Sequence, residues 1–267
     1  MTHDPENILL RATDLTKYYP AARGPTGRRS APIPAVAGID ISIEAGRTTA
    51  LVGESGCGKS TTGRLLLGLE APTGGRVEYR GQDLASMDAN ELRAFRRRAQ
   101  IVFQDPFASL NPRMTVGVML REVMSVHGIA RAEDAVARID VLLGRVGLPK
   151  DAAVHYPHEF SGGQRQRIGI ARALAVEPEF IVLDEPVSAL DVSVQAQVLN
   201  LLRDLQTDLG LTYLFVSHDL SVVKNLADRV LVMRAGAIVE QGLTSEVLST
   251  PQHEYTTELL AAVPQIP

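Results

Sequence analysis

Residues 53–61 have the types and spacing of a loop that holds phosphate groups. The loop follows the apolar run 49–52 and precedes residues 62–67, which have a helical pattern. Glycines let the backbone wrap around a phosphate with its N–H groups pointing inward, and the N-terminus of a helix favours negative charge. We therefore predict a phosphate-binding loop between a strand and a helix. Its residues are Gly53, Glu54, Ser55, Gly56, Cys57, Gly58, Lys59, Ser60 and Thr61.

Two side chains of this loop indicate the substrate. Lys59 is placed to reach the β- and γ-phosphates of a nucleotide, and the hydroxyl of Ser60 is placed to bind Mg²⁺. The alternative is an ordinary glycine-rich turn before a helix. The position between a strand and a helix favours the phosphate site, so we expect ATP as substrate and Mg²⁺ as cofactor.

A pair of acidic residues follows the apolar run 180–183, which is typical of a strand buried on both faces. Asp184, at the end of that strand, is placed to hold Mg²⁺ through water. Glu185 points elsewhere and is placed to polarise an attacking water molecule. The alternative for this pair alone is a strand end followed by a solvated turn.

The segment 160–167 predicts a second helix N-terminus that binds an anion. Ser161 is a plausible N-cap, and the two glycines after it allow the backbone to approach a phosphate closely. One nucleotide does not need two such sites in one subunit, but a dimer that sandwiches each nucleotide between its two subunits does. The residues of this second site are Ser161, Gly162, Gly163 and Gln164.

These sites need a scaffold of alternating strands and helices. A long Pro/Gly/Arg-rich loop is expected at 20–34, and a largely helical segment at 107–160. The alternation predicts an α/β fold with a mainly parallel sheet covered on both sides. Strands are expected at 8–19, 36–44, 49–52, 76–79, 101–103, 180–183 and 212–216, and helices at 90–98, 162–176 and 193–209.

Composition limits the possible functions. The 267 residues fit one large α/β domain, and the net charge of −4 argues against a dedicated nucleic-acid binder. Cys57 is the single cysteine, so an intrachain disulfide is impossible. A helix N-terminus tends to lower a thiol pKa, which would let alkylation or oxidation of Cys57 block ATP binding; the alternative, which we favour, is a small residue that fits the loop. The polar start is unlike a signal peptide, and no apolar run is long enough to span a bilayer.

Taken in order, these motifs resemble the nucleotide-binding subunit of ATP-binding cassette (ABC) transporters over residues 8–243. The sequence F-S-G-G-Q ends at Gln164, 20 residues before Asp184, and is similar to the signature motif of that family. The resemblance implies that Gln104 reaches Mg²⁺ and the attacking water and that His218 contacts the γ-phosphate. It also implies that Asp191 lies in the D-loop and that Tyr19 stacks on adenine, with Tyr18 as the alternative.

The resemblance also implies a fold. It is a P-loop NTPase (RecA-like) core with a mainly parallel sheet, an antiparallel β subdomain and an inserted α-helical subdomain. The expected bounds are 8–106 and 161–243 for the core with its antiparallel part, 107–160 for the helical subdomain and 244–267 for a short helical tail. All of these belong to a single nucleotide-binding domain, 1–267.

Three segments, 104–113, 188–197 and 253–260, resemble the ATPases of oligopeptide, dipeptide and nickel importers. This implies an ATPase at the cytoplasmic face of the membrane that powers import, most of all of di- or oligopeptides. The implied partners are two transmembrane permeases, a second ATPase subunit and, indirectly, an extracytoplasmic substrate-binding protein. A heterodimer of ATPases is favoured over a homodimer. We expect no iron–sulfur cluster, because the cysteines of relatives that bind one are missing.

Two other functions stay open. An ABC exporter shares every hydrolytic motif with an importer, and only the segments 104–113 and 188–197 argue for import. A soluble ABC-type ATPase of translation or DNA repair is the other alternative. Such proteins usually carry two cassettes or a long coiled coil, for which 267 residues leave little room.

Overall fold

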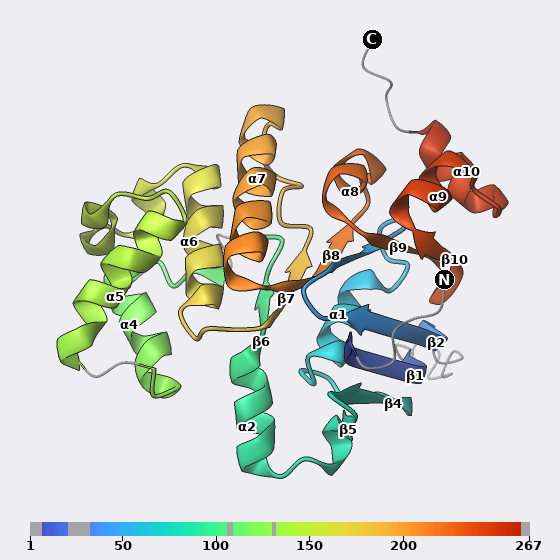
Figure 1. The fold of residues 1–267 in the computed structure, drawn as a ribbon, viewed down its shortest axis with the longest axis horizontal. Helices are drawn as coiled ribbons and strands as arrows, with labels where there is room; N and C mark the ends of the chain where they lie inside the picture. Colours follow the sequence, from blue (N-terminus) through green and yellow to red (C-terminus); the bar gives the residue numbers. More distant parts are fainter. Residues whose placement is uncertain (1–6, 21–32, 106–108, 130–131, 263–267) are drawn as a thin grey trace, which may run out of the picture. The chain divides into compact units, whose positions relative to one another are not determined.

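Strand β3 (Thr48–Val52) leads directly into the phosphate loop, and all five of its residues are buried. In the computed structural model, which describes residues 7–20, 33–105, 109–129 and 132–262, the chain divides into two units. The first unit is made of 1–92 and 213–267, and the second of 93–212. Figure 1 shows the elements of both.

The first unit holds a sheet in which β3 is central. Its strand order is β10, β9, β3, β8, with β9 and β8 parallel to β3 and β10 antiparallel to β9. Parallel strands covered on both faces are apolar throughout, which explains the uninterrupted burial of β3 and β8. The bounds are β8 (Thr212–Ser217), β9 (Arg229–Arg234) and β10 (Ala237–Leu243).

A second sheet of the first unit is antiparallel, in the order β2, β1, β4, β5. The alternating isoleucines Ile39, Ile41 and Ile43 are buried, as their spacing predicted. The expectation of a loop through residue 34 was wrong, because β2 starts at Ile33, which pairs with Tyr19. Residues 21–32 of that loop lie outside the described residues. The bounds are β1 (Ile8–Tyr19), β2 (Ile33–Glu44), β4 (Gly74–Tyr79) and β5 (Gln82–Asp83).

The helices of the first unit come from two parts of the chain, one before residue 93 and one after residue 212. The C-terminal ones, drawn in orange and red in Figure 1, come after β8 and β10. Their bounds are α1 (Lys59–Leu66), α8 (Leu220–Leu226), α9 (Thr244–Ser249) and α10 (Glu254–Ala261), with a short 3₁₀ helix η2 (Leu84–Ser86).

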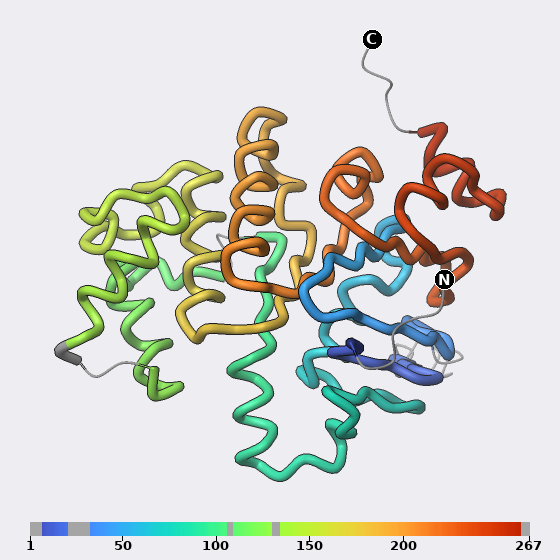
Figure 2. The backbone as a smooth tube through the Cα atoms, in the orientation of Figure 1, coloured from blue at the N-terminus to red at the C-terminus, as the bar shows by residue number. Residues whose placement is uncertain are grey.

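The second unit combines a parallel strand pair with a group of helices. Strands β6 (Ala99–Val102) and β7 (Phe180–Asp184) pair in parallel, and β7 is wholly buried. Helices α4, α5 and α6 contact one another, as the chain trace in Figure 2 also shows. The bounds are α4 (Val116–Val126), α5 (Ala132–Arg145), η3 (Lys150–Val154), η4 (Pro157–Glu159), α6 (Gly162–Leu174) and α7 (Val192–Leu209).

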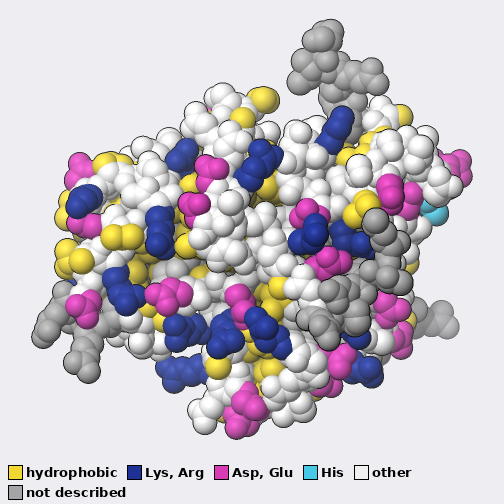
Figure 3. All heavy atoms as spheres, in the orientation of Figure 1, with side chains coloured by type: hydrophobic (Ala, Val, Ile, Leu, Met, Phe, Trp, Pro, Cys, Tyr) yellow, Lys and Arg dark blue, Asp and Glu magenta, His cyan; other side chains and the backbone are white. Residues whose placement is uncertain are grey.

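Helix α2 (Ala89–Arg98) runs across the boundary of the two units, and its arginines bond within the second one. Arg93 donates to the carbonyl of Val126 at 2.6 Å, and Arg97 donates to the carbonyl of Val176 at 3.3 Å. Figure 3 shows basic side chains over α2 with acidic side chains beside them. These arginines therefore attach α2 to its own chain.

The α/β class with a mainly parallel sheet and a separate antiparallel sheet is confirmed. The expected domain bounds stay a prediction. Across the part of the chain that the structure describes, helices are too short or too polar to cross a membrane.

Candidate functional site

The phosphate loop connects β3 to α1, and its first and last glycines lie against neighbouring backbone. A Cβ atom at Gly53 would stand 2.1 Å from the carbonyl oxygen of Met233, and one at Gly58 would stand 2.0 Å from that of Ala35. Both glycines also have positive φ angles, 154° and 112°. Only glycine fits these two positions, so the loop packs closely on β9 and β2.

The side chain of Lys59 folds back onto the backbone of its own loop. Its side chain is buried, and its ammonium donates to the carbonyl oxygens of Gly53 at 2.7 Å and Glu54 at 2.8 Å. A buried charge needs such partners, and an ammonium has three donors. Two of them hold the loop in its rounded shape, and the charge lies at the centre of that loop.

The tip of the loop and the first turn of α1 are accessible. Ser55 and Gly56 are exposed, Ser60 and Thr61 are partly exposed, and a Cβ atom at Gly56 would meet open space. The first N–H groups of a helix have no acceptor within the helix, and the helix dipole adds positive potential there. These groups and Lys59 make the loop a fitting cradle for phosphate.

The side chain of Cys57, unlike this accessible tip, is buried. Burial raises the pKa of the thiol, and this effect outweighs the nearby positive charge of Lys59. The expectation of a lowered pKa from the helix N-terminus was therefore wrong. Cys57 is a small residue that fits the loop, and its thiol is not activated.

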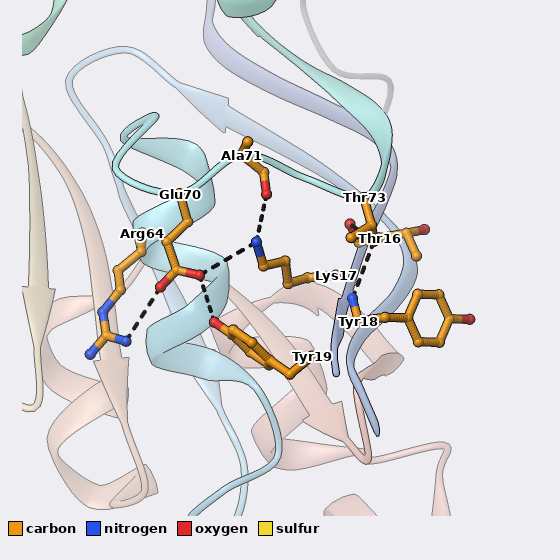
Figure 4. Close-up of polar contacts among 8 residues, drawn as sticks. All are labelled: Thr16, Lys17, Tyr18, Tyr19, Arg64, Glu70, Ala71 and Thr73. Atoms are coloured by element: carbon orange, nitrogen blue, oxygen red, sulfur yellow. Dashed lines mark hydrogen bonds and ion pairs between the residues drawn. The ribbon is translucent and has the colours of Figure 1, made fainter. Parts of the chain in front are cut away.

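Tyr19 ends β1 in a cluster of charged side chains, shown in Figure 4. Its hydroxyl donates to the carboxylate of Glu70 at 2.6 Å, and this bond is the main reason that the pKa of Glu70 is lowered and that of Tyr19 is raised. Lys17 and Arg64 lie 3.7 Å and 3.6 Å from the same carboxylate. The ring of Tyr19 is therefore fixed in one orientation.

Tyr18 lies differently. The ring of Tyr18 points away from the cluster in Figure 4, and the residue is 44% exposed.

Lys17 lies beside the other tyrosine. Its ammonium stands 5.4 Å from the centre of the Tyr19 ring, which places the positive charge next to that aromatic face. Sequence reasoning missed Glu70, because nothing in its own surroundings marks it as the partner of a tyrosine 51 positions earlier.

His218 follows β8 directly and is exposed. The residues on both sides of it are bonded to each other, since the N–H of Asp219 donates to the hydroxyl of Ser217 at 2.9 Å. Asp219 then caps α8 by accepting from the N–H of Ser221 at 2.8 Å. The backbone at His218 is thus held at a sharp turn, and its imidazole is presented at the carboxyl end of a strand.

In the second unit, Gln104 and Glu185 are brought together. The side-chain amide of Gln104 donates to the Glu185 carboxylate at 3.1 Å, and Ser188 lies 3.5 Å from the same amide. Glu185 has a φ of 47°, a left-handed conformation that is uncommon for a residue other than glycine. Asp184, the last residue of β7, is buried. Two predicted site residues, 81 positions apart, therefore share one hydrogen bond.

The second predicted anion site is a well-formed helix N-terminus. Ser161 caps α6 by accepting from the N–H of Gln164 at 3.3 Å, and the Gln164 side chain accepts from the N–H of Ser161 at 3.0 Å. This reciprocal pair confirms the predicted N-cap. A Cβ atom at Gly163 would stand 2.4 Å from the side chain of Val194, while Gly162 is exposed.

Asp191 caps the neighbouring helix α7. Its carboxylate accepts from the N–H of Val194 at 2.9 Å and from the hydroxyl of Ser193 at 2.8 Å. These bonds, the first above all, lower the pKa of Asp191. The carboxylate therefore stays ionised and holds the start of α7.

The donor set fits Mg²⁺ only in part. Within the described ranges, no three His, Cys, Asp or Glu side chains gather as a metal cage. Mg²⁺ commonly takes one or two protein ligands and completes its shell with phosphate oxygens and water. Ser60 and Asp184 each carry an oxygen donor of the kind that Mg²⁺ prefers.

Fold and site together define an ATPase cassette. Residues 36–188 match the ABC transporter family, and the chain belongs to that family as one of its ATPases. Its relatives include the oligopeptide transport ATP-binding protein AppF of Bacillus subtilis, 48% identical over 265 residues, which cover 99% of this chain and 80% of AppF. The dipeptide transport ATP-binding protein DppF of Escherichia coli is 49% identical over 97% of this chain and 77% of DppF.

Two solved structures have the same fold as this chain. The fold matches cbiO1 of Clostridium perfringens, part of the transporter complex cbiONQ, with a TM-score of 0.78 and 28% identity over 92% of each chain. It also matches the ATP-binding cassette MJ0796, solved as a dimer in a post-hydrolysis state with ADP and Pi. There the TM-score is 0.75 with 29% identity, over 88% of this chain and 98% of the other.

Proposed function

We propose that this chain is the ATP-binding and ATP-hydrolysing subunit of a membrane importer for di- or oligopeptides. The observation that carries the proposal is the similarity, over nearly the whole chain, to proteins named for oligopeptide and dipeptide transport, at 48% and 49% identity. The loop geometry supports the same chemistry, because its two close-packed glycines and buried Lys59 form a phosphate cradle. An exporter or a soluble ABC-type ATPase is not favoured by these relatives.

We assign binding of the nucleotide to the first unit. The backbone N–H groups of 55–61 and the ammonium of Lys59 neutralise the phosphates. The ring of Tyr19, held by Glu70, stacks on the adenine. Ser60 would bind Mg²⁺, which would supply charge neutralisation on the phosphate oxygens. We assign a second ligand role to Asp184, which belongs to the second unit.

We assign hydrolysis to three polar residues. Glu185 orients water and accepts its proton, and Gln104 holds the Glu185 carboxylate by the hydrogen bond between them. His218 donates to the γ-phosphate from the end of β8. The pairing of Gln104 with Glu185 links the general base to a third candidate ligand of the metal.

The assembly extends beyond one chain. Two cassettes close head to tail, so that the N-terminus of α6, with Ser161, Gly163 and the neighbouring Asp191, serves the nucleotide of the partner. The second cassette is a paralogue, and two permeases span the membrane while this chain stays at the cytoplasmic face. An extracytoplasmic binding protein delivers the peptide to the permeases.

A tagged pull-down from gently solubilised native membranes tests the transport role. Recovery of two multi-span permeases and a second ATPase is the expected result, and stimulation of ATPase activity by peptide-loaded binding protein would add the direction of transport. A matched Lys59→Ala variant should assemble equally well and lack activity. Recovery with ribosomes or DNA, in the soluble fraction only, would overturn the transport role and leave the ATPase chemistry in place.

A further inference from the structure

The C-terminal helix α10 contacts the phosphate loop through one side chain. Tyr255 is 1% exposed, and its hydroxyl accepts a hydrogen bond from the backbone N–H of Glu54 at 3.0 Å. The two residues are 201 positions apart, and both belong to the first unit. The guanidinium of Arg234 stands 4.7 Å from the centre of the tyrosine ring and covers one face of it.

Both backbone groups of Glu54, the N–H and the carbonyl oxygen, form hydrogen bonds. Its N–H donates to Tyr255, and its carbonyl oxygen accepts from the ammonium of Lys59 at 2.8 Å. Glu54 lies outside the strands and helices, so its N–H has no partner in a ladder or a helix, and its bond to the buried Tyr255 hydroxyl is partly shielded from water. The N–H of Glu54 shares its peptide group with the carbonyl of Gly53, which accepts from the Lys59 ammonium at 2.7 Å, so the tyrosine hydroxyl fixes a peptide that also holds the lysine.

Tyr255 is itself firmly placed. Its N–H donates to the ring of His253 at 3.1 Å, and the N–H of His253 donates to the carboxylate of Glu240 in β10 at 3.1 Å. Burial raises the pKa of the Tyr255 phenol, so the hydroxyl stays neutral at ordinary pH. A continuous set of hydrogen bonds thus runs from β10 through the start of α10 to the phosphate loop.

We propose that Tyr255 is a positioning residue of the nucleotide site, whose hydroxyl keeps the Glu54 peptide and the Lys59 ammonium in the shape that receives phosphate. The inference rests on the proposed role of residues 53–61 as the ATP site. Tyr255 does not touch the nucleotide. Without its hydroxyl the loop spends part of its time in other shapes, and the apparent Kd for ATP rises in inverse proportion to the fraction of chains that keep the competent shape.

Tyr255→Phe tests this proposal, because it keeps the buried ring and removes only the acceptor. Leaving a backbone donor without its partner should raise the KM for ATP about tenfold, while kcat at saturating ATP changes less than about twofold. Hydrogen exchange of residues 53–58 in the nucleotide-free chain should become faster. Arg234→Ala, which keeps the hydroxyl, should change KM far less.

The matched control is Tyr213→Phe. Tyr213 is a buried tyrosine of β8 that pairs with Thr48, at the far end of β3 from the loop. This variant should leave the KM and the loop exchange unchanged even if it lowers the melting temperature. An unchanged KM and unchanged loop exchange in Tyr255→Phe would overturn the proposal, whatever its melting temperature.

One measurement needs no variant. In the wild-type chain, the amide of Glu54 should exchange at least about tenfold more slowly than the exposed amide of Ser55, and equal rates would overturn the proposal. Failure of the wild-type chain to bind ATP is a different result, because it would reject the proposed site itself. The exchange rates decide between these two failures.

Discussion

The side-chain amide of Gln104 donates to the carboxylate of Glu185 at 3.1 Å. Glu185 adopts a left-handed backbone conformation at the end of β7, with a φ of 47°. Such a conformation is costly for a residue other than glycine, and the hydrogen bonds around it offset that cost. Ser188 contributes to them, since its hydroxyl donates to the carbonyl of Glu185 at 3.1 Å.

Glu185→Gln should bind ATP normally and hydrolyse it about 10²- to 10⁴-fold more slowly, because an amide cannot accept the proton of the attacking water. Single-turnover hydrolysis and equilibrium binding of ATP measure the two effects separately. The amide can still bond to Gln104, so the fold should be retained. Near-normal turnover in this variant would remove Glu185 from the role of general base.

Tyr19→Ala should raise the KM for ATP by about 5- to 150-fold, because a stacked base is worth about 1–3 kcal/mol. Tyr18→Ala is the matched comparison, since the ring of Tyr18 points away from the cluster and is exposed. Its KM should stay close to that of the wild type. If Tyr18→Ala gives the larger change, the stacking role belongs to Tyr18.

Glu70 should give the chain an acid-sensitive part of its stability. The pKa of Glu70 is lowered in the folded chain from its usual value of 4.5, mainly by the hydroxyl of Tyr19. A lowered pKa contributes stability that is present above the usual value and is lost as pH falls through the folded value.

The difference in unfolding free energy between wild type and Glu70→Gln should therefore shrink as pH falls from about 7 to about 3. Urea unfolding at a series of pH values measures this difference. A difference that stays constant over the whole range would show that the carboxylate of Glu70 is not stabilised by its neighbours.

Iodoacetamide should react slowly with Cys57 in the folded chain, because the thiol is buried and its pKa is raised. In urea the same thiol should react at the rate of an ordinary cysteine. Mass spectrometry of the alkylated chain over time gives both rates, with ATPase activity followed in parallel. Rapid labelling and loss of activity in the folded chain would contradict this prediction.

Local sequence pattern was sufficient for most of the scaffold. Residues 36–44 alternate with a period of two and form part of β2, and the continuous apolar run 180–183 forms most of β7. The N-cap at Ser161 was also predictable, since serine, two glycines and glutamine form a capping box. The information for these features lies within a few neighbouring residues.

Contacts between distant residues were not predictable in the same way. The partner of Tyr19 lies 51 positions away and the partner of Glu54 lies 201 positions away. The pKa of Cys57 was wrongly expected to fall, because the helix N-terminus is visible in the sequence and the burial of the thiol is not. Burial depends on the packed structure, which a local motif does not contain.

The bond between Glu54 and Tyr255 also bears on how the chain is made. The ribosome synthesises the phosphate loop early, but the residue that holds its second peptide is added 201 positions later. A nascent chain that ends before Tyr255 contains the complete loop sequence and lacks the acceptor for the Glu54 N–H. Until Tyr255 has been added, such a nascent chain should therefore hold ATP about tenfold more weakly than the folded chain, because its loop is not kept in one shape.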